Sequence, residues 1–93
     1  MRKYELMVIF RIEEDLSKSG LEGVKAALSE YGAEIEKEDP FGDRDLCYEI
    51  KKQRRGHFVL FVVKSNPAKI VDIQNRLKLN KDVLKYLFVK IDG

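Results

Sequence analysis

Apolar and polar residues alternate with a period of two along several segments, which is the pattern of β-strands. Residues 3–10 and residues 57–64 both alternate in this way, and in both segments each face carries apolar side chains. Strands that are apolar on both faces are typical of the centre of a sheet. We therefore predict that these two segments are central strands. A further strand is predicted from about Val83 to Ile91.

An acidic strand is predicted at residues 33–39. Pro40-Phe41-Gly42 interrupts it before the alternation resumes in residues 46–50. Proline cannot donate a hydrogen bond to a neighbouring strand, and charged side chains protect a sheet edge from pairing. The segment is therefore expected at an edge of the sheet, with a bulge or bend. Residues 51–56 are predicted to form the turn that leads into the strand at residues 57–64.

Two other segments have the spacing of helices. Residues 21–31 place apolar side chains on one stripe, with Asp15 or Ser17 as the expected N-cap and Gly32 as the left-handed residue after the last turn. Asn66-Pro67 predicts the start of a second helix, since Asn is a good N-cap and Pro suits the first helical position. The buried stripe of this second helix is expected to consist of Ile70, Ile73 and Leu77.

The order of these elements is β-α-β-β-α-β, in a single domain that covers residues 1–93. This order predicts an α+β fold of the ferredoxin-like, split β-α-β type, with a four-stranded antiparallel sheet and two helices on one face. A chain of 93 residues with 44% apolar residues is long enough to build one core of this kind. The architecture names no function, because it hosts many.

The charged residues are unevenly distributed along the chain. The whole chain has 18 basic and 16 acidic residues, a net charge of +2. Residues 1–50 hold 7 basic and 13 acidic residues, a net charge of −6, whereas residues 51–93 hold 11 and 3, a net charge of +8. A basic second half favours an anionic partner.

No segment has the pattern of a membrane span or of a signal peptide. The longest apolar run, Phe58–Val63, has six residues, whereas a membrane helix needs about 20. Glu5 interrupts the N-terminal segment where a signal peptide would be continuously apolar. We therefore expect a soluble, cytoplasmic protein that has no membrane partner.

Groups for catalysis or metal binding are scarce. Cys47 and His57 are the only thiol and imidazole. They lie on strands joined by the predicted hairpin, so they are able to approach each other. The simpler interpretation is a small half-buried cysteine and a histidine beside a turn. The acidic edge strand contains Glu34, Glu36, Glu38 and Asp39. These carboxylates would suit Ca²⁺ or Mg²⁺, but they lack the loop spacing of a metal cage, and a solvated edge strand explains them.

The sequence also lacks the motifs of enzymes that handle phosphate. It has no glycine-rich phosphate loop. Arg11 lies near the position of the phosphate-binding arginine of acylphosphatases, but the acidic residues that follow it would repel phosphate. His57 lacks the setting of the catalytic histidine of nucleoside-diphosphate kinases. We therefore predict no catalytic residues, metal ion, cofactor or small-molecule substrate.

The predicted hairpin turn carries a cluster of basic residues that favours RNA binding. Four cations occur within five residues, namely Lys51, Lys52, Arg54 and Arg55. They repel one another, and an anionic partner would relieve that repulsion. An ordinary solvated turn is the alternative. Three further cations, Arg2, Lys3 and Lys90, are expected to join the cluster if the first and last strands lie side by side.

The face of the predicted sheet that the helices leave open is expected to be apolar. Its residues are Met7, Ile9, Phe58, Leu60, Val62, Leu87 and Val89. Residues 55–61 are similar to the signature of RNA recognition motifs, but with one residue missing and His57 in place of an aromatic residue. In those motifs aromatic side chains stack on bases. Aliphatic side chains suit a protein partner instead, and ordinary partial burial and a self-dimer are the alternatives.

The segment Gly42–Lys51, with the sequence GDRDLCYEIK, resembles the signature of a known family, ribosomal protein six of the bacterial small subunit. That signature consists of Gly, any residue, basic or Cys, polar, Leu, Ser or Ala, Tyr, any residue, Ile, and a basic or small polar residue. Cys47 departs from it, where Ser or Ala is usual. Other segments that resemble the family are Arg2-Lys3-Tyr4-Glu5, Tyr31-Gly32-Ala33, Gly56-x-Phe58 and Lys81–Tyr86.

The resemblance covers the whole chain and implies a structural, non-catalytic role. Members of the family are ferredoxin-like and bind the central domain of small-subunit ribosomal RNA, as a heterodimer with small-subunit ribosomal protein eighteen. Carried over to this chain, the resemblance implies that Arg44 and the basic hairpin contact RNA or the partner. The alternative from another class is a stand-alone ligand-sensing or protein-interaction module that homodimerises through its sheet.

Overall fold

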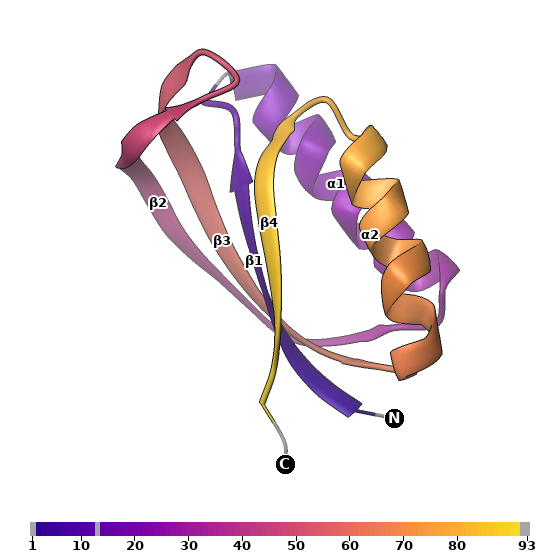
Figure 1. Ribbon diagram of the computed structural model, residues 1–93. Helices are drawn as coiled ribbons and strands as arrows, with labels where there is room; N and C mark the ends of the chain where they lie inside the picture. The colour runs from indigo at the N-terminus through magenta and orange to yellow at the C-terminus, as the bar shows by residue number, and fades with distance from the viewer. Residues whose placement is uncertain (1, 13, 92–93) are drawn as a thin grey trace.

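Four strands form one sheet, and both long helices lie against the same face of it (Figure 1). The computed structural model describes residues 2–12 and 14–91. In chain order the elements are β1 (Arg2–Phe10), α1 (Glu14–Glu30), β2 (Glu34–Ile50), β3 (Gln53–Ser65), the short 3₁₀ helix η1 (Pro67–Lys69), α2 (Ile70–Leu79) and β4 (Val83–Lys90).

The strands lie in the order β2-β3-β1-β4, and every neighbouring pair is antiparallel. This topology confirms the predicted ferredoxin-like fold. It also confirms that β1 and β3 are central and that the acidic β2 lies at an edge.

The core lies between the helices and one face of the sheet. Alternate residues of β1 and β3 point into it, which follows from the period of two along a strand. The helices contribute the stripes that their spacing predicts, although Leu21, Tyr31 and Ile70 are only partly buried. The largest fully buried side chains are Phe10, Phe61, Leu6, Leu28, Ile73 and Leu77.

Most of the predicted helix ends are confirmed. Gly32 has a φ of +74°, and Ala33 donates a backbone hydrogen bond to Leu28 O at 2.8 Å, which is the Schellman arrangement after α1. Asn66 Oδ1 accepts a hydrogen bond from Ala68 N at 3.0 Å and so caps η1, which continues into α2. The prediction of Asp15 or Ser17 as the first N-cap is wrong, because α1 already begins at Glu14. No helix in the described part of the chain is long and apolar enough to cross a membrane.

The β2–β3 hairpin is longer, and its turn shorter, than predicted. β2 is a strand of 17 residues whose pairing with β3 shifts at three points, one of them between Pro40 and Gly42. The turn consists of Lys51 and Lys52 alone, because Ile50 already pairs with Gln53. The prediction of a turn over residues 51–56 is therefore wrong, and Arg54 and Arg55 lie on β3.

The far end of the hairpin folds over the sheet. Figure 1 shows it curling at the end of the sheet away from Arg2 and from the last residues of β4. Gly56 makes close packing possible there, because a Cβ at this position would clash with Cγ2 of Ile9 and would also meet Leu46 Cδ2 at 3.5 Å. The absence of a side chain at Gly56 thus lets the hairpin cross directly over Ile9.

Candidate RNA and partner interface

The two-residue turn presents two lysines in an unusual backbone conformation. Lys51 and Lys52 have φ angles of 48° and 66°, the left-handed values that two-residue hairpin turns need in order to match the twist of the strands. Glycine or asparagine is usual at such positions, and other residues adopt them at a cost of roughly 1 kcal/mol or more each. Lysine at both positions places two cations in the turn itself.

One of these lysines is fixed in place and the other is not. Lys51 Nζ donates a hydrogen bond to Val83 O at 3.1 Å and so connects the turn to the first residue of β4. Lys52 is exposed and has no hydrogen bond or ion pair within the described residues. Its ammonium group is therefore available to a partner.

The two arginines of the cluster lie on β3 and have acidic neighbours on β2. Arg55 Nε lies 3.0 Å from Asp45 Oδ1, and Arg54 Nε lies 3.9 Å from Glu49 Oε2. All four side chains are at least half exposed, and exposed pairs of this kind contribute only about 0–1 kcal/mol. Either guanidinium can therefore exchange its carboxylate for a phosphate at little cost.

Arg44 lies on β2, within the same hairpin. It is exposed and pairs in register with Gly56 on β3. The neighbouring pair is Asp43 and His57, and His57 Nδ1 lies 2.9 Å from Asp43 Oδ1. The histidine therefore has a carboxylate partner rather than Cys47, which is an exposed free thiol. This arrangement gives no support to a cysteine–histidine nucleophile pair.

Arg2, Lys3 and Lys90 do not join the hairpin cluster. β1 and β4 do lie side by side, but Tyr4 pairs with Lys90 at one end of that ladder and Phe10 pairs with Val83 at the other. The hairpin contacts the Val83 end through Lys51. The expectation of one cluster is therefore wrong, because these three cations lie at the opposite end of the sheet.

At that opposite end, Lys3 takes part in a network centred on Glu36. Glu36 lies 3.1 Å from Lys64 Nζ and 3.2 Å from Lys3 Nζ. The hydrogen bond from Lys64 and, to a smaller extent, the one from Lys3 lower the pKa of Glu36 below its ordinary value. Because the folded state binds the ionised form better, this contribution to stability is present above the pKa of the unfolded chain and is lost as the pH falls through the folded pKa.

Two further acidic residues of β2 are also paired with lysines. Glu38 lies 2.7 Å from Lys25 Nζ, and Asp39 lies 3.1 Å from Lys37 Nζ. Across the described ranges 2–12 and 14–91, no group of three or more His, Cys, Asp or Glu side chains is arranged to hold a metal ion. The carboxylates of Glu36, Glu38 and Asp39 therefore serve as partners for lysines.

The face of the sheet away from the helices carries a band of apolar side chains. Met7 on β1 pairs in register with Leu60 on β3 and with Leu87 on β4, so these three residues form one row across the sheet. Leu87 is 56% exposed and Val89 is 46% exposed. We refer to Met7, Phe58, Leu60, Val62, Leu87 and Val89 as the open-face patch. Glu5 lies on this face between Val62 and Val89. An exposed apolar surface of this kind is typical of a protein–protein contact.

Two residues differ from the expected composition of this face. Ile9 lies on it but is only 9% exposed, because the hairpin crosses over it at Gly56. It is therefore not available to a partner. Ile91, directly after β4, is 40% exposed and adds a residue that the sequence reasoning missed.

A pocket of about 220 Å³ lies where the hairpin meets the open-face patch. Its lining combines residues of the signature segment with residues of the sheet, namely Ile9, Asp45, Leu46, Cys47, Tyr48, Ile50, Phe58 and Lys85. The sequence reasoning did not select Leu46, Tyr48 or Ile50 for a site. Their alternation marked them as strand residues and the signature segment includes them, but neither pattern indicates that the strand folds back over the sheet.

The surfaces described above together indicate a class of protein. Cations gather at the hairpin, apolar side chains gather on the open face, and no metal cluster or nucleophile pair is present among the described residues. The molecule is a ferredoxin-like domain with separate charged and apolar surfaces.

Comparison with known proteins supplies the family. The family model described as "Ribosomal protein S6" matches residues 3–90. A small ribosomal subunit protein bS6 from Treponema denticola is 48% identical over 99% of both chains, and one from Treponema pallidum (strain Nichols) is 45% identical over the full length of both. The crystal structure of 30S ribosomal protein S6 from Thermotoga maritima superposes with a TM-score of 0.87, at 22% identity, over 97% of this chain and 87% of that one.

The chain belongs to the ribosomal protein S6 family, which confirms the resemblance of the signature segment. It is accordingly a structural, non-enzymatic component of the small ribosomal subunit, and it is located in the bacterial ribosome in the cytoplasm. The solved structure, at under 25% identity, supports the fold alone.

Proposed function

We propose that this chain binds the central domain of small-subunit ribosomal RNA together with small-subunit ribosomal protein eighteen, and so supports assembly of the small subunit and translation. In this proposal residues 1–93 act as one domain. The RNA domain and the partner come from the family resemblance, and the surfaces described above suggest how each is contacted.

The observation that carries the proposal is the separation of the two surfaces. The helices cover one face of the sheet, which leaves its other face and the hairpin exposed to RNA and to a protein partner. Lys52, Arg54 and the other hairpin cations would contact phosphates, because Lys and Arg neutralise the RNA backbone. The open-face patch would dock the partner, because its aliphatic side chains cannot stack well on bases.

The remaining cations of the proposed interface are expected to contribute unequally to RNA binding. Arg44 is exposed within the hairpin and belongs with it. Arg2, Lys3 and Lys90 form a separate region at the far end of the sheet, where Lys3 is already engaged with Glu36. We propose RNA contacts there too, but a smaller contribution from Lys3, because phosphate would have to displace a carboxylate.

Sedimentation separates this function from the alternative of a free module that homodimerises through its sheet. The tagged chain, expressed in bacterial cells, is expected to sediment with small ribosomal subunits in a sucrose gradient and to leave them when high salt removes surface proteins. A chain found only in the light fractions, as a dimer joined through Leu87 and Val89, would favour the alternative and overturn the proposal.

A further inference from the structure

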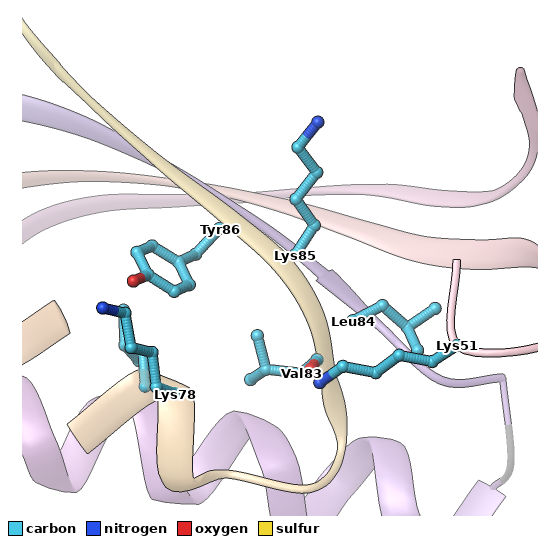
Figure 2. A pocket seen from close by; sticks show the side chains of 7 residues that line it. Lys51, Lys78, Val83, Leu84, Lys85 and Tyr86 are labelled. Carbon is cyan, nitrogen blue, oxygen red and sulfur yellow. Dashed lines mark hydrogen bonds between the residues drawn. The ribbon is translucent and has the colours of Figure 1, made fainter. Parts of the chain in front are cut away.

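A pocket at the outer edge of β4 lies where three elements meet. The turn of the hairpin, the start of β4 and the end of α2 enclose about 250 Å³. Its lining consists of Lys51, Leu77, Lys78, Val83, Leu84, Lys85 and Tyr86. Figure 2 shows Lys51 extending toward Val83, Lys78 rising from α2 toward Tyr86, and Lys85 pointing outward from β4.

The charge of this pocket is unbalanced. Three lysines from three different elements line it, and no acidic residue in the described part of the chain does so. Arg54, Arg55 and Lys64 each have a carboxylate within 4 Å, whereas Lys51, Lys78 and Lys85 have no ion pair within residues 2–12 and 14–91. Lys85 pairs in register with Ile9 on the open face and points outward from β4, so the ammonium groups at the pocket itself are those of Lys51 and Lys78. These two repel each other, and a bound anion would relieve that repulsion.

Lys51 is already positioned for such a ligand. Its hydrogen bond to Val83 O uses one of the three donors of the ammonium group, so the charge is held at the pocket while two donors stay available. Restricting the side chain in advance lowers the entropy cost of binding. The Tyr86 hydroxyl adds a further polar group to the lining.

The position of Lys78 also has an explanation that involves no ligand, but this explanation does not apply to the other lysines of the pocket. It lies in the last turn of α2, where a cation interacts favourably with the roughly half negative charge of the helix dipole. That explains one lysine of the three. The helix dipole does not compensate the ammonium group of Lys51, so the pocket stays attractive to anions.

The arrangement favours a chain of phosphates over a small anion. The floor is apolar, with Leu77, Val83 and Leu84, and in Figure 2 the three ammonium groups point apart rather than toward one point. A single small phosphate could not contact all of them, whereas successive phosphates of an RNA backbone could. The pocket is also continuous with the hairpin, because Lys51 belongs to both.

We propose that the pocket formed by Lys51, Lys78, Lys85 and Tyr86 binds backbone phosphates of RNA, so that the RNA path continues from the hairpin across the start of β4 to the end of α2. This inference rests on the proposed function. It adds Lys78 and Lys85, which lie outside the sequence-predicted interface, to the RNA contacts.

The test is the salt dependence of binding to a small-subunit RNA transcript in the presence of small-subunit ribosomal protein eighteen. The double variant Lys78→Gln/Lys85→Gln is expected to lower the slope of log K against log salt by between one and two units, because each phosphate contact contributes about 0.7–0.9. Lys69→Gln is the matched control. Lys69 is exposed on η1, away from the pocket, and has no ion pair among described residues, so its loss should leave the slope unchanged.

A second variant separates failure of this inference from failure of the proposed function. Lys52→Gln/Arg54→Gln changes the hairpin without touching the pocket. If this hairpin variant lowers the slope and the pocket variant does not, the inference is overturned and the proposed function stands. If neither lowers it, both are overturned.

Titration with inorganic phosphate distinguishes an RNA backbone from a free anion as the ligand. Chemical shifts of Lys78 and Lys85 that move little up to millimolar phosphate agree with the inference. Saturation at micromolar phosphate, together with an unchanged RNA slope in the pocket variant, would identify a site for a free anion and overturn it.

Discussion

Replacing the four hairpin cations with glutamine, at Lys51, Lys52, Arg54 and Arg55, is expected to weaken RNA binding and to lower its salt slope by about three to four units. The reason is counterion release, since each phosphate neutralised by the protein contributes about 0.7–0.9 to the slope. The fold should persist, because all four residues are exposed and the ion pairs of Arg54 and Arg55 are weak. Fluorescence anisotropy with labelled RNA from about 50 to 200 mM salt measures the slope.

The matched control keeps the charge and changes the side chains. In the variant with Lys51→Arg, Lys52→Arg, Arg54→Lys and Arg55→Lys, the salt slope should stay near that of the parent protein. A slope that is unchanged in the glutamine variant would remove the hairpin from the RNA interface. A slope that falls equally in both variants would show that geometry rather than charge is responsible.

Leu87→Asp is expected to weaken binding of small-subunit ribosomal protein eighteen by about 30-fold or more, which corresponds to at least about 2 kcal/mol. A carboxylate in the centre of an apolar contact would be desolvated without a partner. Leu87 is a better target than Leu60, because it is 56% exposed whereas Leu60 is only partly exposed. Isothermal titration calorimetry measures the affinity.

Val71→Asp is the matched control for this change. Val71 is 62% exposed and lies on α2, in the layer on the other side of the sheet. The free energy of unfolding of both variants should lie within roughly 1 kcal/mol of that of the parent protein, since substitutions at exposed positions have small effects. If Leu87→Asp binds as well as Val71→Asp, the partner does not dock on the open-face patch.

The fold could be predicted because its signals are local. The period of two in β1 and β3, the stripes of α1 and α2, and the caps at Gly32 and Asn66 each depend on a few neighbouring residues. The boundary of the hairpin could not be predicted in the same way. Lys51 and Lys52 have low preference for a two-residue turn, so six polar or glycine residues were assigned to a turn that the pairing of Ile50 with Gln53 reduces to two.

The interface was only partly predictable, because its arrangement depends on contacts between distant segments. The alternation of β4 places Leu87 and Val89 on the open face, as the structure has them. Nothing local indicates that the hairpin folds over Ile9 or that Lys51 reaches Val83. For the same reason Arg2 and Lys90 were grouped with the hairpin although they lie at the other end of the sheet.

RNA affinity measured at increasing concentrations of small-subunit ribosomal protein eighteen tests most directly whether this chain binds RNA jointly with that partner. The expected result is tighter binding of a central-domain transcript when the partner is present, with a matching gain in partner affinity when RNA is present, because coupling between two ligands is reciprocal. A gain of about 5- to 150-fold is typical of such coupling. An RNA affinity that is the same with and without the partner would contradict joint binding.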